Sequence, residues 1–246
     1  MRAFFSKDPG NLQIVEFKPL HLIMVGLLAI AIYLTFRYAD RIKANVKTEK
    51  HLPLFLGIAA WVLEIVFHIW NYVNKTHFVK NLIPLELCSI SLVLTVFLCF
   101  SNNQSVFEIY YFFSIGALMA ILFPSYGGFG PDRFRFYHYF FCHSYIVWLN
   151  FYYLKVKGFR LRRTAFLRLV AVMIPLSFLT RFIDLRFDVD YMFLLGPSAT
   201  KSPLDFLGDG NAYFYKLLLL ALTIFFVLYL AGPKENKNAE AASLSD

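Results

Sequence analysis

The chain has 246 residues, of which 59% are hydrophobic, 19% aromatic and 16% charged, with a formal net charge of +8 and a mean hydropathy of +0.56. Soluble domains are about 45–50% apolar and about 25% charged, so this composition excludes a water-soluble fold of this length and indicates a membrane protein. Basic loops that face anionic lipid explain the positive charge, and no nucleic-acid partner is needed.

The sequence predicts an all-α, polytopic membrane helix bundle with about seven transmembrane spans. A bilayer core needs about 20 apolar residues per helix. Prolines mark the expected starts of the first three helices, at Pro19, Pro53 and Pro84, and Pro175 falls inside the sixth. The seven predicted spans cover residues 19–37, 53–73, 84–101, 106–124, 136–155, 165–186 and 212–231.

Lysines and arginines gather in two short loops, residues 37–50 and 155–163. Cytoplasmic loops carry an excess of these residues, and both loops fall on the same side of a seven-span chain. The prediction is therefore a multi-pass cell-membrane protein with its N-terminus outside and its C-terminus in the cytoplasm. Residues 1–232 are expected to form a single transmembrane helical domain, followed by a disordered polar tail over residues 233–246.

Polar side chains at membrane depth are costly and mark candidate functional sites. In the second span Glu64, His68 and Asn71 recur at helical spacing, so they share one stripe and Glu64 can pair with His68. A hydrogen-bonded pair that joins two helices is the structural alternative to a functional carboxylate.

The third span opens with PLELCSISLVLTVFLC, in which Cys88, Ser91, Thr95 and Cys99 share one face. Small residues on one face let another helix approach closely, which explains the last three. Cys88 lies one turn inside a helix expected to begin at Pro84, where the positive charge of the helix terminus is already fading. A reactive Cys88 therefore needs a base from another helix, and an inert apolar filler is the alternative.

The fifth span contains two histidines in an aromatic sequence. His138 and Cys142 are separated by one helical turn, and His143 lies on a different face. A histidine inside a membrane is a bonded structural residue, a base or a proton carrier.

The sixth span ends with Arg181 and Asp184, and Tyr191 follows at the membrane edge. The spacing of Arg181 and Asp184 favours a local ion pair, but an arginine at this depth also suits a phosphate or carboxylate. In the predicted topology, His68, Cys88, His143 and Arg181 all approach the outer face.

Three segments, LIPLELC, FRFYHYFFCHSYIVW and DYMFLLGPSATKSPLDFLG, resemble the YwaF-like family of bacterial integral membrane proteins over roughly residues 53–230. That family is similar to an animal membrane acyltransferase family that remodels ether phospholipids. By motif, the acyltransferase's nucleophilic cysteine falls on Cys88 and its partner histidine on His143. The sequence departs from the family pattern at Glu86, where histidine or glutamine is commoner, and at Asp190, where asparagine is commoner.

The resemblance implies a lipid acyltransferase or acyl hydrolase near the outer leaflet, acting on membrane phospholipids or lysolipids, with Cys88 as nucleophile and His143 as base. No metal or organic cofactor is implied. The remaining candidate residues would bind or orient the substrate: Glu64, His68, Glu86, His138, Arg181, Asp184 and Tyr191.

Two other functions are open at this point. A small-solute or proton-coupled transporter would use Glu64 and His68, and a non-catalytic accessory membrane protein would use none of these groups chemically. Nothing in the sequence indicates an oligomeric state.

Overall fold

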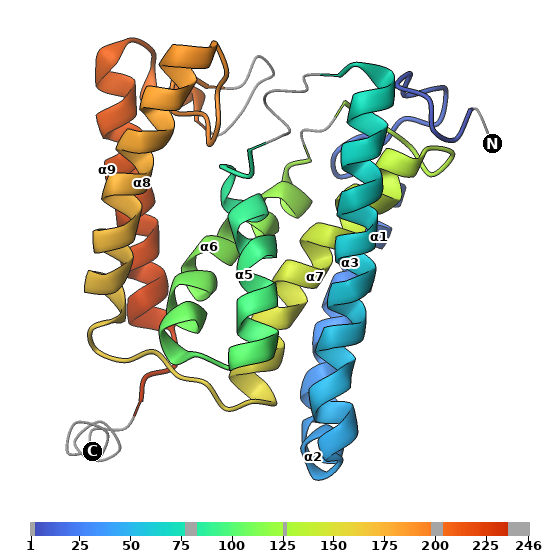
Figure 1. Cartoon of the computed structure of the whole chain (residues 1–246), viewed down its shortest axis with the longest axis vertical. Helices are drawn as coiled ribbons and strands as arrows, with labels where there is room; N and C mark the ends of the chain where they lie inside the picture. The colour runs from blue at the N-terminus through green and yellow to red at the C-terminus, as the bar shows by residue number, and fades with distance from the viewer. Residues whose placement is uncertain (1–2, 77–82, 125–126, 198–203, 236–246) are drawn as a thin grey trace. The chain divides into compact units, whose positions relative to one another are not determined.

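The computed structural model of the chain describes residues 3–76, 83–124, 127–197 and 204–235. Two short elements, α2 (Ala39–Ala44) and the 3-10 helix η1 (Asp205–Leu207), lie in connections between long helices. The long helices of the described residues are α1 (Pro19–Arg37), α3 (Val46–Asn74), α5 (Leu87–Ser101), α6 (Gln104–Leu122), α7 (Phe134–Lys155), α8 (Ala165–Phe187) and α9 (Asn211–Ala231) (Figure 1).

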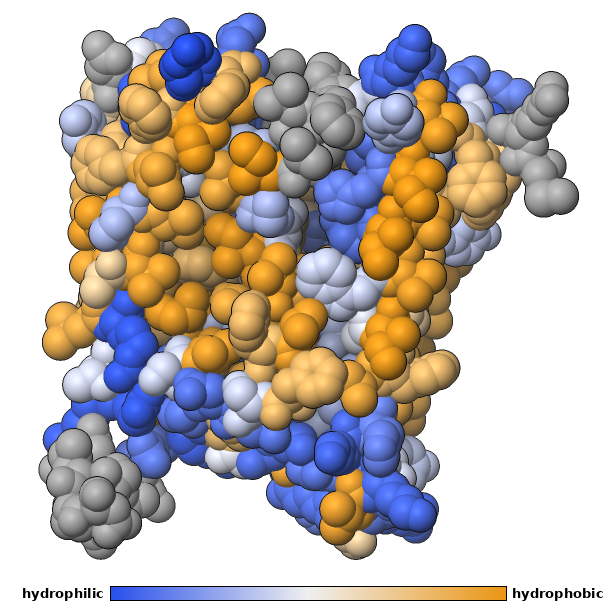
Figure 2. All heavy atoms as spheres, viewed as in Figure 1, coloured by the Kyte–Doolittle hydropathy of each residue, from blue (hydrophilic) through white to orange (hydrophobic). Residues whose placement is uncertain are grey.

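These long helices coincide with the predicted spans and confirm a polytopic helical membrane bundle. Within the described residues, five helices are long and apolar enough to cross a membrane, namely α1, α3, α6, α8 and α9. Helix α5 is apolar but shorter. Figure 2 shows an apolar stripe along α3 with hydrophilic residues at both ends, the pattern of a helix that faces lipid.

The chain divides into two compact units, and each is described by itself. The first comprises Met1–Leu82 with Leu87–Phe159, and the second comprises Ile83–Glu86 with Arg160–Asp246. The first unit thus contains the long helices α1, α3, α5, α6 and α7, and the second contains α8 and α9. The expected single domain over residues 1–232 stays a prediction.

Helix α7 is the centre of the first unit and packs against α1, α3, α5 and α6. Its tyrosine hydroxyls donate hydrogen bonds to backbone carbonyls of these neighbours. Water is absent at membrane depth, so polar groups there must be satisfied within the protein. The bonds run from Tyr139 to Ala120 of α6 (2.7 Å), from Tyr145 to Pro53 of α3 (3.1 Å) and from Tyr153 to Leu98 of α5 (2.7 Å).

Pro53 lies inside α3 and not at its start, so the predicted helix start is wrong. The helix begins at Val46 because Asn45 caps it, its Oδ1 accepting the Thr48 backbone N–H at 3.1 Å. Proline has no N–H, so the carbonyl of Glu49 loses its usual partner one turn later. The Tyr152 hydroxyl donates to that carbonyl at 2.7 Å, and the helix continues through the proline.

The start of α5 also differs from the prediction. The helix begins at Leu87 and not at Pro84, which places Cys88 in its first turn. This turn packs closely on α6 at Gly116, where an added Cβ would lie 2.9 Å from the Leu87 Cβ. A glycine is therefore required at this contact.

The two basic loops contact one another through an ion pair in the first unit. Lys157 Nζ lies 2.7 Å from Glu49 Oε1, which joins the end of the first loop to the beginning of the second. The N-terminal segment lies at the opposite end of α3, where the Trp70 indole N–H donates to the Phe5 carbonyl at 2.9 Å.

In the second unit, α8 and α9 pack through aromatic pairs such as Phe178 with Phe214. The first residues of the predicted tail are ordered: Leu161 donates to the Pro233 carbonyl at 2.9 Å and accepts from the Glu235 N–H at 3.0 Å. Residues 236–246 of that tail lie outside the described residues.

The role of Tyr152 predicts a coupling with Pro53. Tyr152→Phe leaves the Glu49 carbonyl without its partner and is expected to cost about 1 kcal/mol of unfolding free energy. In a Pro53→Ala background the loss should be smaller, because the introduced alanine supplies the missing N–H. Thermal unfolding of the four proteins in detergent measures the coupling. Tyr33→Phe, on the exposed surface of α1, is the control, and an equal cost of Tyr152→Phe in both backgrounds would contradict the account.

Candidate functional site

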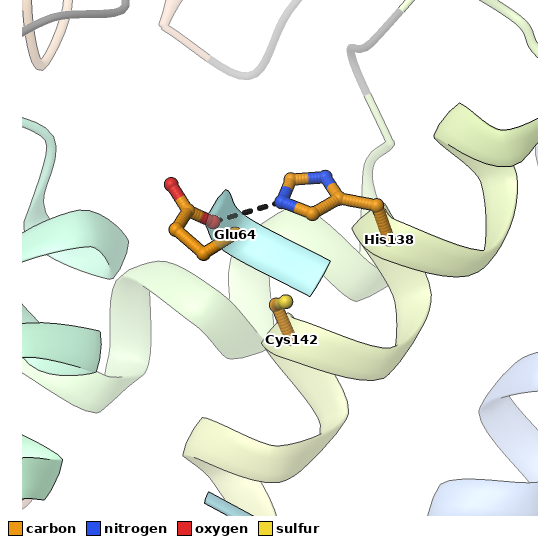
Figure 3. Close-up of side chains that lie close together, drawn as sticks. All are labelled: Glu64, His138 and Cys142. Carbon is orange, nitrogen blue, oxygen red and sulfur yellow. Dashed lines mark hydrogen bonds and ion pairs between the residues drawn. The ribbon is translucent and has the colours of Figure 1, made fainter. Parts of the chain in front are cut away.

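A polar array links α3 and α7 in the first unit. His138 Nε2 of α7 lies 2.8 Å from Glu64 Oε2 of α3, and Figure 3 shows the imidazole and the carboxylate facing one another. The other carboxylate oxygen, Glu64 Oε1, lies 3.5 Å from His68 Nε2. The predicted Glu64–His68 pair is therefore confirmed, and Glu64 joins two histidines through its two oxygens.

Arg135 fixes the proton position on His138. Its Nη1 lies 2.6 Å from His138 Nδ1. A guanidinium donates hydrogen bonds and accepts none, so Nδ1 must be the acceptor. A neutral imidazole with an accepting Nδ1 carries its proton on Nε2, and that N–H donates to Glu64.

Aromatic rings enclose this array. The Phe67 ring stacks on His138 with centroids 4.3 Å apart, and the Arg135 guanidinium lies 4.0 Å from the Phe67 centroid. Phe134 packs against the His138 ring at 5.9 Å. The cation–π contact supports the position of Arg135, so the rings hold both partners of the Arg135–His138 bond.

Cys142 lies one turn below His138, and its ligand atom with those of Glu64 and His138 falls within 4.8 Å of one another (Figure 3). Such a group could hold a metal ion. The bond from Arg135 opposes this, because a metal on Nε2 would require the proton on Nδ1, where Arg135 already donates. The residues therefore fit a hydrogen-bonded cluster better than a metal site, and the Cys142 thiol donates to the Ala60 carbonyl at 3.6 Å.

His143 has the opposite proton arrangement. Its Nδ1 lies 2.7 Å from the Tyr139 carbonyl of the preceding turn. A carbonyl accepts and never donates, so Nδ1 carries the proton and Nε2 keeps a lone pair. The Tyr139 ring packs on the imidazole at 4.3 Å and helps fix its orientation. The second histidine of α7 is thus arranged as a proton acceptor at Nε2.

Cys88 and His143 lie on neighbouring helices, α5 and α7. Lower in the same helix pair, Cys99 Sγ lies 3.7 Å from the Tyr145 hydroxyl. Ser91 and Thr95 are buried, as expected for a packing face.

The other predicted residues belong to the second unit. Asp184 Oδ1 accepts the Tyr191 backbone N–H at 3.0 Å, and Arg181 Nη1 donates to the Leu194 carbonyl at 2.8 Å. Glu86 accepts the Met192 N–H at 2.9 Å. Burial, together with the charges of Asp184 and Glu86, raises the pKa of Tyr191. These contacts hold the loop after α8 in a defined conformation.

This loop needs such support because Met192 and Phe193 both have positive φ, 54° and 58°. Non-glycine residues in this region are strained by about 1–3 kcal/mol each and persist where surrounding contacts fix them. Seven of the nine predicted site residues therefore form two groups. Glu64, His68 and His138 form one in the first unit, and Glu86, Arg181, Asp184 and Tyr191 form the other around this loop.

Arg135 is the site residue that the sequence analysis missed. Its place three residues before His138 was a visible signal, because residues at this spacing share one helix face. The contact of His138 with Glu64, between residues 74 positions apart, had no local signal.

The fold and these intramembrane polar groups define a multi-pass helical membrane protein. The chain belongs to the TMEM164 family, whose family model matches residues 16–229. No curated protein and no solved structure matches the chain.

The two histidines of α7 are predicted to be opposite tautomers. In ¹⁵N-histidine NMR of the protein in nanodiscs, His138 should show its proton on Nε2 and His143 should show its proton on Nδ1. His138→Gln and His143→Gln assign the signals. Arg135→Gln should disturb the His138 tautomer and leave that of His143 unchanged. The same tautomer for both residues would contradict the assigned hydrogen bonds.

Proposed function

We propose that this TMEM164-family protein is a membrane lipid acyltransferase or acyl hydrolase, with Cys88 as nucleophile and His143 as general base. Its substrates would be membrane phospholipids, and the acceptor would be a lysolipid or water. The resemblance to YwaF-like proteins and to the ether-phospholipid acyltransferase family is part of this proposal.

The observation that carries the proposal is the orientation of His143. The His143 Nδ1–H donates to the Tyr139 carbonyl oxygen, with 2.7 Å between nitrogen and oxygen. Nε2 is therefore the basic atom. In cysteine–histidine enzymes the base is likewise oriented by a third group, which fixes the tautomer needed for proton transfer. Here a backbone carbonyl takes the place of the third residue.

The position of Cys88 supports a nucleophilic role. Cys88 lies in the first turn of α5, which begins at Leu87. The partial positive charge of a helix N-terminus acts on this turn and stabilises negative charge there. The sequence-based expectation of a weaker helix effect rested on a start at Pro84.

The reaction would proceed in two balanced steps. The Cys88 thiol gives its proton to His143 Nε2, and its sulfur attacks the ester carbonyl of a phospholipid. The acyl–sulfur bond forms, the ester C–O bond breaks, and the leaving alkoxide takes the proton from His143. An acceptor hydroxyl then gives its proton to His143 and attacks the thioester, which returns Cys88 as a thiol. Water as acceptor yields a fatty acid.

A proton-coupled transporter is the second candidate, because Glu64, His68 and His138 place titratable side chains within α3 and α7. One carboxylate contacts both an exposed histidine, His68, and a buried one, His138. Proton uptake into proteoliposomes that is lost in Glu64→Gln and retained in Cys88→Ala would support transport.

Cys88→Ala is expected to abolish transfer of a labelled acyl chain from phospholipid to lysophospholipid by the protein in nanodiscs. Cys99→Ala removes a cysteine from the same helix, α5, and should retain activity. A chloroacetamide with a fatty chain, mapped by mass spectrometry, should modify Cys88, and His143→Gln should reduce this adduct several-fold. Full activity of Cys88→Ala, or equal labelling of all three cysteines with and without His143, would refute the mechanism.

A further inference from the structure

His68 occupies an unusual place on the surface of α3. Its side chain is 44% exposed. The side chains around it on the helix, Ile65, Ile69 and Tyr72, are also exposed and are apolar or aromatic. Residues three and four positions apart are surface neighbours on a helix, so His68 is a polar group within a lipid-facing surface.

The polar array runs from His68 on this surface to His138 in the interior of the first unit. The exposed side-chain fraction falls from 44% at His68 to 18% at Glu64 and 5% at His138. A polar group at membrane depth is retained when it faces a partner, a cavity or a ligand path. The exposed end of this array is His68, on the surface of α3 in the first unit.

The end of the bundle above His138 is covered by the N-terminal segment. The Phe4 carbonyl accepts the Phe134 backbone N–H at 2.9 Å, and the Phe4 and Phe5 rings pack on Phe134, which contacts His138. Trp70 donates to the Phe5 carbonyl at 2.9 Å. These rings therefore pack over the His138 end of the array.

The covering segment is attached at further points. Arg133 Nε donates to the Asp8 carbonyl at 2.8 Å, and the Ile14 N–H donates to the Gly128 carbonyl at 3.0 Å. Ile14 is buried in an aromatic cluster with Phe67 and Trp70. These hydrogen bonds and the shared apolar cluster therefore fix the segment over the site.

Protons cannot pass from His138 to Arg135, so the array does not form a proton path in that direction. Arg135 faces His138 Nδ1, and a guanidinium has no acceptor for a further proton. A path across the membrane would need an acceptor there. This arrangement is better suited to binding a polar group than to conducting protons.

We propose that His68 and Glu64 form a lateral portal, through which the polar head of a membrane lipid reaches the Glu64–His138 array from the bilayer side of α3. The lipid chains would lie against Ile65, Ile69 and Tyr72. The N-terminal segment closes the aqueous route. The choice of lipid as occupant rests on the proposed function, whereas the portal itself does not require Cys88.

The test uses the full-length protein in nanodiscs and a lysophospholipid with an alkyl diazirine next to its headgroup. Photolysis followed by mass spectrometry should place adducts on Glu64 or His68. A probe with the diazirine at the chain end should label these residues several-fold less. Adducts confined to Ile65, Ile69 and Tyr72, or equal labelling of Glu64 and His68 by both probes, would overturn the portal.

Matched variants locate the entry. His68→Leu replaces the polar group by an apolar one and should lower the Glu64 adduct several-fold. His51→Leu removes another exposed histidine of α3 and should leave the adduct unchanged. An equal effect of the two variants would overturn the role of His68.

The closed aqueous route is tested with a water-soluble carbodiimide and glycine ethyl ester. Exposed Glu16 of the N-terminal segment should be modified, and Glu64 should not. Trp70→Phe with Arg133→Gln loosens the segment and should admit the reagent to Glu64. Trp148→Phe, which loses an indole bond to Thr35 elsewhere in the unit, is the control. Modification of Glu64 in the unchanged protein would refute closure.

Cys88→Ala separates this proposal from the proposed function. Photolabelling of Glu64 should persist in Cys88→Ala. Loss of acyl transfer with retained labelling supports both proposals. If Cys88→Ala retains both acyl transfer and labelling, the Cys88 mechanism is refuted and the portal is supported. If the unchanged protein transfers acyl chains but neither Glu64 nor His68 is labelled, only the portal is refuted.

Discussion

The hydrogen bonds from the tyrosine hydroxyls of α7 to the carbonyls of its neighbours are the constraint on which the first unit depends. Each bond satisfies a tyrosine hydroxyl where no water is available, and each fixes the register of α7 against another helix. The bond to Glu49 also allows Pro53 to lie inside α3 without ending it. The reach of the tyrosine side chain and the register of the helix are therefore set together. Replacing one of these tyrosines by phenylalanine would lower the free energy of unfolding.

The register of α7 against α3 then determines the chemistry of the polar array. It brings His138 to Glu64. Arg135, three residues earlier on α7, bonds to the other imidazole nitrogen. His143, five residues after His138, turns to another face and bonds to its own helix. Two histidines of one helix thus differ in tautomer because their nearest partners differ. A donor faces Nδ1 in one and an acceptor faces Nδ1 in the other.

Local sequence patterns predicted the helices and one contact of the site. Apolar length located the long helices, Pro19 marked the start of α1, and the four-residue spacing paired Glu64 with His68. The start of α3 was missed because the cap at Asn45 and the bond from Tyr152 together override Pro53. Glu86, predicted to bind or orient the substrate, accepts the Met192 N–H. That contact joins residues 106 positions apart, which no local pattern specifies.

The direction of the tyrosine bonds bears on how the protein is made. Among the described helices, α7 is not one of the five that are apolar and long enough to cross a membrane unaided. The carbonyls that accept from Tyr139, Tyr145, Tyr152 and Tyr153 all belong to residues that precede α7 in the chain. During synthesis, therefore, α7 emerges after its acceptors have been made. The residues to which α7 bonds are thus available, on helices already made, when α7 packs into the first unit.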